Sequence, residues 1–351
     1  MPRYYTRVCN FYYGNNSKKL VNKKKTIPFN GIKEISFDQI EIITRNSKKK
    51  VFINQIRHLP KLIKKKINFD LKKIKTKKKN FSSLNFKKIP NVMGVLNLTP
   101  DSFSDGGKFN SKNKGINHAI NLLNSGASLI DIGGESTRPG SKVIKENLEW
   151  QRIHKTLKSL LKKKIPISLD TRKSKIMRRG VNLGVKLIND VSGLDFDYET
   201  LNVLKKYKVP FVIQHSQGNP ENMQKNPRYK NELLDIYDFF EKKINLLRSR
   251  GIKHDKIILD PGIGFGKNLK HNMSLIRNIS LFHSLGFPIL VGNSRKRFIK
   301  ELSGKNDSKL RYGGTIASSI YLMTQGVQIL RVHDVNEIIQ GFKIFKNIID
   351  N

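Results

Sequence analysis

The sequence contains one cysteine, Cys9, among 351 residues. A single thiol cannot form a disulfide within the chain, and it cannot supply the thiolate cluster of a structural zinc site. The 8 histidines are scattered, and none belongs to an HExxH pattern. A disulfide framework and a cysteine-based zinc site are therefore both excluded.

Long apolar runs are also missing. No stretch approaches the roughly 18 apolar residues that cross a bilayer. The first residues, MPRYYTRVCNFYYG, lack the apolar centre of a secretory signal. We therefore expect a cytoplasmic protein with no membrane partner, and the 37% of hydrophobic residues are enough for a sizeable globular core.

Acidic side chains are few, with 27 Asp and Glu against 68 Lys and Arg, which gives a net charge of +41. Such a charge commonly indicates a nucleic-acid partner. Here the excess is lysine, in runs at 23–25, 48–50, 64–66 and 77–79, without the arginines and stacking aromatics of an RNA-binding face. We expect no specific nucleic-acid partner, although anionic substrates would be attracted.

The first 85 residues differ from the remaining chain, residues 86–351. Short alternating segments at 35–37, 40–44 and 51–54 predict a small β-rich N-terminal extension, and a lysine-rich connector follows at 61–79. We expect this extension to be a packing element or a dimer edge. Binding to a polyanion is the less favoured alternative.

From residue 91 onward a pattern of strand, loop and helix repeats eight times. Strands are predicted at 92–98, 128–132, 166–169, 187–188, 210–213, 257–259, 288–291 and 329–332. Helices are predicted at 116–124, 148–161, 174–183, 198–206, 232–250, 273–285 and 315–324, with a last one after 335. This count over about 260 residues is typical of the α/β class and of a TIM (β/α)8 barrel, and a doubly wound open sheet is the alternative.

A polar residue follows every predicted strand. In a barrel, functional groups lie at the carboxyl ends of the strands. The residues concerned are Asn97, Asp131, Asp170, Asn189, Asp190, Gln214, His215, Asp260, Ser294, Arg295, Lys296, Arg331 and His333. One alone could be a helix cap or a core group, but eight strand ends together favour a site for a small polar heterocycle with an anion at its edge.

Two loops, the one after the first strand and a glycine-rich one, carry further candidate features. Asn97, Asp101 and Asp105 supply oxygen ligands that favour magnesium, although the two aspartates could also cap turns. The segment GIGFGK at 262–267 has neither the Walker spacing nor the GxGxxG spacing. It favours a close turn beneath a ligand.

Ordered motifs across the repeat identify a family. They are MGVLNLTPDSFSDGG, DIGGESTRPGS, SLDTRK, INDVSG, QGNPENMQ, LDPGIGFGK, GNSRK and RVHDV. In this order they resemble the dihydropteroate synthases, from residue 91 to about 345. The resemblance implies a TIM barrel that joins p-aminobenzoate to 6-hydroxymethyl-7,8-dihydropterin diphosphate in folate biosynthesis, releasing pyrophosphate. It also implies Mg²⁺ as the cofactor and a homodimer.

The resemblance implies roles for the residues that would meet the pterin. Asp260 would accept from the pterin ring N–H and amino group, as one carboxylate can accept two donors. Asp170 and Asn189 would meet the other nitrogens, and Lys296, also a catalytic candidate, would donate to the carbonyl edge. Ser294 would lie near p-aminobenzoate. The alternatives are that Asp170 caps a helix and that Lys296 is solvated.

Other roles concern the diphosphate, the cation and the amine. Arg331 and His333 are separated by a single residue, so strand alternation directs both side chains to the same face, where they would form an anion clamp. The resemblance makes Asn97 the magnesium ligand. It implies that Asp101 and Asp105 stabilise a pterin carbocation, and that Thr137, Arg138 and Pro139 form a loop that closes over p-aminobenzoate. An ordinary surface loop is the alternative.

Three positions depart from the family pattern. Gln214 stands where a pterin-packing methionine is usual, Ser216 replaces a second methionine, and Arg297 replaces a small residue. These departures put substrate affinity in question, while the reaction class is unaffected. The competing functions are a pterin-binding methyltransferase, which has no diphosphate to expel, a basic nucleic-acid-binding protein and an inactive paralogue.

Overall fold

Eight parallel strands form a barrel in the computed structural model, which describes residues 3–99, 113–137, 140–218, 223 and 226–350. The strands are β5 (Asn91–Asn97), β6 (Leu129–Gly133), β7 (Ile167–Asp170), β8 (Leu187–Asp190), β9 (Phe211–Gln214), β10 (Ile257–Asp260), β11 (Leu290–Val291) and β12 (Ile329–Val332). Their order is β10-β9-β8-β7-β6-β5-β12-β11. A parallel bridge between Leu259 and Ile289 joins the two ends of this order. The predicted TIM barrel is confirmed, and the open sheet is excluded.

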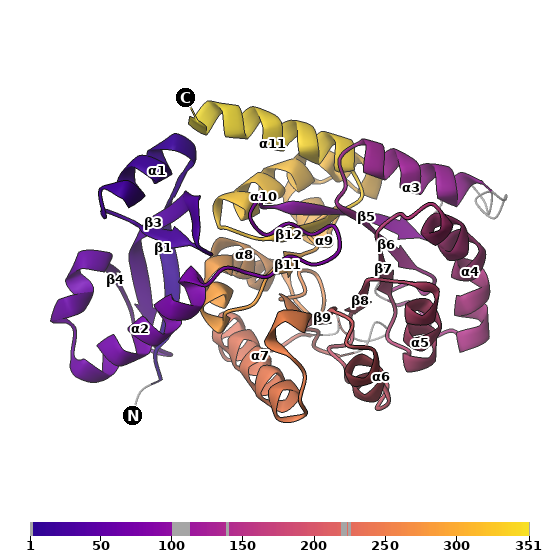
Figure 1. The fold of residues 1–351 in the computed structure, drawn as a ribbon, viewed down its shortest axis with the longest axis horizontal. Helices are drawn as coiled ribbons and strands as arrows, with labels where there is room; N and C mark the ends of the chain where they lie inside the picture. Colours follow the sequence, from indigo (N-terminus) through magenta and orange to yellow (C-terminus); the bar gives the residue numbers. More distant parts are fainter. Residues whose placement is uncertain (1–2, 100–112, 138–139, 219–222, 224–225, 351) are drawn as a thin grey trace.

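Helices surround this barrel (Figure 1). They are α3 (Lys114–Asn124), α4 (Glu146–Lys162), α5 (Ser174–Leu183), α6 (Thr200–Tyr207), α7 (Glu232–Ser249), α8 (Leu269–Arg277), α9 (Arg297–Ser303), α10 (Tyr312–Thr324) and α11 (Val335–Asp350). The single helix predicted at 273–285 was wrong, because α8 ends at Arg277 and a buried 3₁₀ segment, η5 (Ile279–Leu285), follows it. Among the described residues, no helix has the length and apolar character needed to cross a membrane.

Strand alternation sorts the barrel side chains into two sets. Ile130, Ile188 and Leu330 belong to the large core shared with the helices. The neighbouring residues of the same strands point into the barrel, where Leu129, Leu187, Ile258 and Ile329 form an apolar layer near its amino end. Two residues later on these four strands stand Asp131, Asn189, Asp260 and Arg331. The same alternation therefore produces an apolar lower layer and a polar upper layer.

The N-terminal extension is a small antiparallel sheet with helices. It consists of β1 (Tyr5–Tyr13), α1 (Gly14–Asn22), β2 (Ile27–Phe29), β3 (Ile32–Ile43), β4 (Lys48–Phe52), a 3₁₀ segment η1 (Ile53–His58) and α2 (Lys61–Lys75). The β-rich extension is confirmed, but the segments predicted at 35–37 and 40–44 belong to one strand, β3. The connector predicted at 61–79 was wrong, because most of it is α2, whose buried Ile67, Leu71 and Ile74 form an amphipathic stripe.

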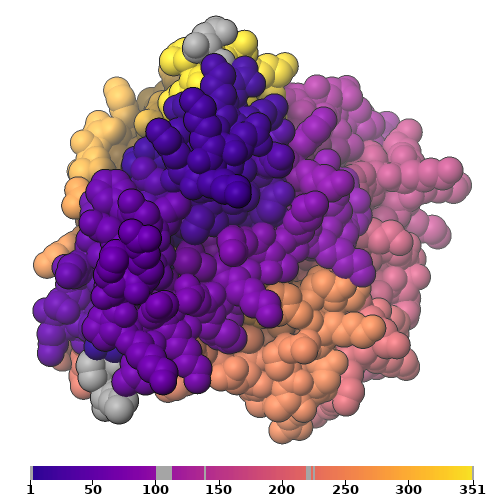
Figure 2. Space-filling view, turned by 60° about the vertical axis from the view of Figure 1, so that its left-hand side comes forward, coloured from indigo at the N-terminus to yellow at the C-terminus, as the bar shows by residue number. Residues whose placement is uncertain are grey.

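The extension packs against the barrel on the side of η5, and it covers one side of the molecule (Figure 2). Ser280 Oγ donates to Val8 O over 2.8 Å, and Tyr13 OH donates to Thr324 O over 2.6 Å. One cluster of buried side chains joins the extension to the apolar layer at the amino end of the barrel. The opposite, carboxyl end carries the polar layer.

Candidate active site

Ion pairs connect the polar side chains at the carboxyl end of the barrel. Arg331 Nε lies 2.6 Å from Asp131 Oδ2, and Arg331 Nη2 lies 2.8 Å from Asp170 Oδ2. Asn189 Nδ2 donates to the same Asp131 oxygen over 3.0 Å. Asp170 and Asn189 are neighbours in the β7–β8 register. Four strands, β6, β7, β8 and β12, thus bring their polar ends to one point.

Asp260 and Lys296 lie on the other side of this point. Asp260 Oδ1 accepts from the backbone N–H of Gly262 over 2.8 Å, which fixes the carboxylate at the end of β10. Lys296 precedes α9, and its ammonium lies 4.2 Å from the centroid of the Phe265 ring. Asp260 attracts this ammonium. Recognition groups from β10 and from the loop after β11 therefore face the Arg331 cluster.

The turn at GIGFGK that the sequence predicts is present after β10. Gly262 adopts φ +69°, and a Cβ there would lie 2.0 Å from His215 O. Only glycine fits this combination of a left-handed backbone and a close approach. The turn brings Phe265 under Lys296 and presents the Gly262 N–H to Asp260.

Burial shifts the titration of the charged groups at this site. It raises the pKa of Asp170 to about 8, which Arg331 opposes, and it raises the pKa of Asp260 to about 6. It lowers the pKa of Lys296 to about 8, and nearby Arg331 acts in the same direction. Buried groups lose the hydration that stabilises their charged forms. A ligand that supplies matching donors and acceptors would therefore interact strongly with them.

Ser294 and His333 form the edge of the site next to β12. Ser294 Oγ lies 3.1 Å from His333 Nδ1 and also accepts from the His333 backbone N–H over 3.2 Å. Arg295, between Ser294 and Lys296, is committed elsewhere, because it pairs with Asp334. The two members of the predicted anion clamp, Arg331 and His333, thus have different partners in the structure.

A buried charge network supports the loop after β6. Glu135 binds Arg172 and Lys173 over 2.9 and 2.8 Å, and Lys173 also binds Glu149 over 2.6 Å. Burial opposes ionisation, but these cations hold the pKa of Glu135 below its ordinary value. Thr137, two residues after Glu135, is partly buried. This network is not predictable from the sequence, in which its members appear only as four charged residues in or near the motifs.

Several predicted residues lie outside the described part of the chain. They are Asp101, Asp105, Arg138 and Pro139. Asn97 is described; it ends β5 and is paired in register with Gly133. The described residues contain no group of three or more His, Cys, Asp or Glu side chains that could hold a metal. Because Mg²⁺ is often held by one or two protein oxygens together with substrate phosphates, Asn97 fits such a site.

The three departures from the family pattern have different environments. Gln214 ends β9 next to Asp260 and is buried, with its Nε2 3.5 Å from Val191 O. Ser216 Oγ donates to Gly218 O over 3.1 Å. Arg297 is exposed on α9 and pairs with Glu301 over 2.6 Å. Of the three, Gln214 is at the level of the recognition carboxylates.

Two buried residues of the site had no role assigned from sequence. Asp131 contacts both Arg331 and Asn189, as described above. Lys267 Nζ donates to Phe265 O over 2.8 Å and lies 3.1 Å from His215 Nδ1, and burial lowers its pKa to about 7. Strand alternation could have revealed Asp131, because it occupies on β6 the position that Arg331 occupies on β12.

Comparison with known proteins decides the family. Residues 93–333 match the family described as pterin binding enzyme. The dihydropteroate synthase of Synechocystis sp. is 41% identical over 254 residues, which cover 72% of this chain and 88% of that protein. The chain belongs to the dihydropteroate synthase family.

Solved structures of dihydropteroate synthases agree with this assignment. The Yersinia pestis enzyme in a sulfonamide drug complex superposes with a TM-score of 0.72 at 39% identity, covering 76% of this chain and 96% of that one. The Xanthomonas albilineans enzyme in complex with 7,8-dihydropteroate superposes with a TM-score of 0.68 at 31% identity, covering 76% and 95%. The chain therefore has the fold and the motifs of pterin-binding transferases, whereas residues 1–85 lie outside the matched family region.

Proposed function

We propose that this chain condenses p-aminobenzoate with 6-hydroxymethyl-7,8-dihydropterin diphosphate to give 7,8-dihydropteroate and pyrophosphate. One observation carries the proposal: Asp170, Asn189, Asp260, Lys296 and Arg331 converge at the carboxyl end of one barrel. This set combines acceptors for a nitrogen-rich ring with cations for a carbonyl and an anion. A methyltransferase reaction would give the anion-binding cations no leaving group to bind.

Recognition of the pterin rests on hydrogen-bond polarity. The ring N–H and exocyclic amino group of a pterin are adjacent donors, and the Asp260 carboxylate is an acceptor whose orientation is fixed by the Gly262 N–H. In this proposal Asn189 and Asp170 meet other ring nitrogens, and Lys296 would donate to the ring carbonyl. A ring that lacks these donors would leave buried acceptors unsatisfied, which costs about 1–3 kcal/mol for each polar group and more for a charged one.

The leaving diphosphate is assigned to Arg331 and His333. In the reaction, the bond between the pterin methylene carbon and the diphosphate oxygen breaks, and its electron pair leaves with pyrophosphate. The amine nitrogen of p-aminobenzoate then forms the new C–N bond and loses one proton. Arg331 offsets the charge on the departing oxygens, while nearby carboxylates, with Asp101 and Asp105 as candidates, stabilise the cationic pterin.

The second substrate is assigned to Ser294 and to the loop after β6. Ser294 is buried and lies two residues before Lys296, the proposed donor to the pterin carbonyl. Thr137, Arg138 and Pro139 belong to a loop that would cover this substrate and exclude water from a reactive cation. The buried Glu135 network supports the beginning of this loop.

Magnesium is the proposed cofactor, with Asn97 as its protein ligand. When bound with the diphosphate, the ion would add positive charge to the leaving group. Asn97 lies at the end of β5, one strand away from both Asp131 and Arg331. The magnesium requirement can be measured directly as the activity lost on adding a chelator and recovered on adding excess Mg²⁺.

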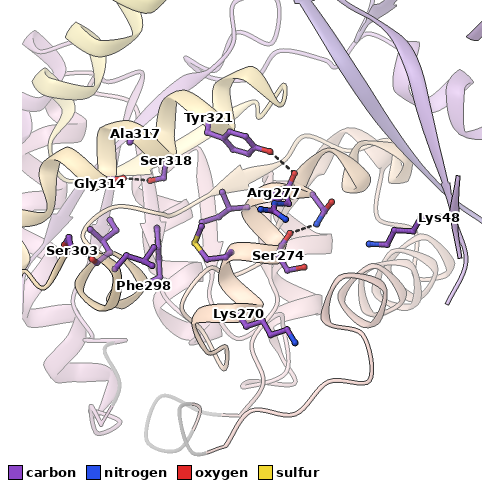
Figure 3. Close-up of a pocket in the computed structure, with 15 residues that line it drawn as sticks. Lys48, Lys270, Ser274, Arg277, Phe298, Ser303, Gly314, Ala317, Ser318 and Tyr321 are labelled. Atoms are coloured by element: carbon purple, nitrogen blue, oxygen red, sulfur yellow. Dashed lines mark hydrogen bonds between the residues drawn. The ribbon is translucent and has the colours of Figure 1, made fainter. Parts of the chain in front are cut away.

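A homodimer in the cytoplasm is also proposed. A groove of about 830 Å³ between α8, α9 and α10 supports the dimer (Figure 3). Met273, Leu302 and Tyr321 line it and are 40%, 60% and 38% exposed. A second copy would cover these apolar side chains. Analytical ultracentrifugation should give twice the chain mass for the wild type and a monomer for Leu302→Arg; a monomeric wild type would rule out the dimer.

The decisive assay is pyrophosphate release from the dihydropterin diphosphate. We expect release that depends on p-aminobenzoate and is accompanied by equimolar dihydropteroate. The control is the Asp260→Ala variant, which should fold but lack turnover. A folded wild-type protein that forms no amine-dependent product would refute the proposed function.

A further inference from the structure

We propose that Asp131 is a positioning residue that orients the pterin-binding amide and the diphosphate-binding guanidinium at the same time. The inference deepens the proposed function and rests on the roles given there to Asn189 and Arg331. Asp131 itself need not touch substrate. Its role is to couple the two halves of the dihydropterin diphosphate site through one carboxylate oxygen.

The geometry around Asp131 supports this role. Its Oδ2 accepts from Asn189 Nδ2 over 3.0 Å and from Arg331 Nε over 2.6 Å. Its Oδ1 is buried and has no hydrogen-bond partner among the described residues. Asn189 and Arg331 therefore account for every hydrogen bond that the structure gives to this side chain. The side chain is completely buried, so bulk water does not compete for Oδ2.

The two donors have few other ways to be oriented. Asn189 is almost fully buried, and its Oδ1 has no hydrogen-bond partner in the described part of the chain. Donation to Asp131 fixes which end of this amide faces the ligand, because an amide that gives its N–H₂ to a carboxylate presents its oxygen in the other direction. A pterin N–H then meets an acceptor. Without Asp131 the amide could rotate and present a donor.

Arg331 is oriented by the same oxygen through its Nε. A guanidinium held at Nε by one carboxylate keeps its terminal nitrogens directed away from that carboxylate. One of them, Nη2, binds Asp170 over 2.8 Å. An incoming diphosphate competes with Asp170 for these terminal nitrogens, while the Nε contact to Asp131 persists. Asp131 thus keeps Arg331 in place while its anionic partner changes.

The test separates the two halves of the substrate. We would measure the affinity of 6-hydroxymethylpterin by calorimetry and the inhibition constant of inorganic pyrophosphate by steady-state kinetics. Asn189→Ala should weaken only the pterin, and Arg331→Lys should weaken only pyrophosphate. Asp131→Asn should weaken both by about ten-fold or more, in line with the loss of groups that orient ligand-binding side chains. The KM for p-aminobenzoate should change by less than about two-fold because this substrate is assigned to other residues.

Asp70→Asn is the matched control. Asp70 is a completely buried carboxylate on α2 of the extension, and its Oδ2 accepts from Thr6 Oγ1 over 2.7 Å. This variant should lower the melting temperature while leaving the affinities for both probes unchanged. If Asp131→Asn does not fold, Asp131→Glu keeps the charge but moves it by one methylene, and it should show the same paired loss to a smaller degree.

Three outcomes would overturn the inference. They are unchanged affinity for both probes in folded Asp131 variants, loss of affinity for one probe alone, and an equal paired loss in Asp70→Asn. The proposed function would survive each of these, because it depends on product formation by the wild type and on its loss in Asp260→Ala. Absence of product from the wild type would instead refute the function itself.

Discussion

At the scale of single residues, the site holds buried charges that neutralise one another only in part. Arg331 binds Asp131 and Asp170, so its single positive charge is shared by two carboxylates. Burial raises the pKa of Asp170, because the Arg331 cation compensates only in part for the lost hydration of the carboxylate. A bound ring with N–H donors would stabilise the ionised form of Asp170. Substrate binding and the protonation state of the site are therefore coupled.

Replacing Lys296 by alanine tests the donor to the pterin carbonyl. Loss of a hydrogen bond from a charged group costs about 1.5–3 kcal/mol, so we expect the KM for the dihydropterin diphosphate to rise by about ten-fold to more than a hundred-fold. The fold should persist. The matched control is Lys300→Ala, which removes an exposed lysine one turn later on α9. Equal KM values for Lys296→Ala and the wild type would reject the assigned role.

The pH dependence of turnover tests Asp260. The ionised form of Asp260 can accept both hydrogen bonds from the pterin, whereas the protonated form cannot. Burial raises the pKa of Asp260 to about 6. Below that pH the group is protonated, so kcat/KM for the dihydropterin diphosphate should fall by about ten-fold per pH unit. The substrate diphosphate also titrates. The pH profile of Asp260→Asn should therefore keep the decrease in kcat/KM that comes from the substrate and lose the decrease that comes from Asp260. Identical pH profiles for the wild type and Asp260→Asn would contradict the assignment.

Part of the site was predictable from the sequence because each strand end carries its own polar residue. Asp170, Asn189, Asp260, Lys296 and Arg331 are recognisable in this way. The pairing among these residues was not predictable from the sequence, because ion pairs such as Arg331 with Asp170 join residues 161 positions apart. Asp131 shows the limit: its position at a strand end is visible in the sequence, but its function depends on two side chains from other strands.

At the scale of elements, periodicity predicted the barrel strands well and the buried or short helices poorly. The predicted barrel strands and amphipathic helices lie near the observed bounds of these elements. The η5 segment was predicted as part of a longer helix because all seven of its side chains are buried, which removes the polar face that marks a helix end. Helix α9 has only seven residues, too few for a clear period. Strand β1 and helix α1 were also not predicted.

Phe29 tests the contact between the extension and the barrel. Its ring is fully buried and meets His283 of η5 at a centroid distance of 4.7 Å. Phe29→Ala leaves a cavity at this contact, so the free energy of unfolding should fall by about 3–5 kcal/mol in urea titrations. Phe69→Ala is the control, because Phe69 is 57% exposed on α2 and should change stability by less than about 1 kcal/mol. A similar small loss in both variants would show that the contact is weak.

At the scale of the whole molecule, the structure separates stability from chemistry. The extension and the apolar layer share one buried cluster at the amino end, while the recognition residues lie at the carboxyl end. Because the two ends are separate, residues at one end of the barrel can be substituted without altering the other end. The extension packs against the amino-end side of the barrel and lies away from the recognition residues.

The shared cluster predicts that the extension and the barrel unfold together. Trp150, the single tryptophan, lies on α4 of the barrel, so its fluorescence reports barrel unfolding. Hydrogen exchange of β3 reports the extension. Because the two parts share a buried core, both signals should change at the same urea concentration. Phe29→Ala, although located in the extension, should shift the Trp150 transition as far as the β3 transition, whereas Phe69→Ala should shift neither. Loss of β3 protection at a lower urea concentration than the Trp150 transition would mean that the extension is an independent unit, since a cooperative core cannot lose one part first.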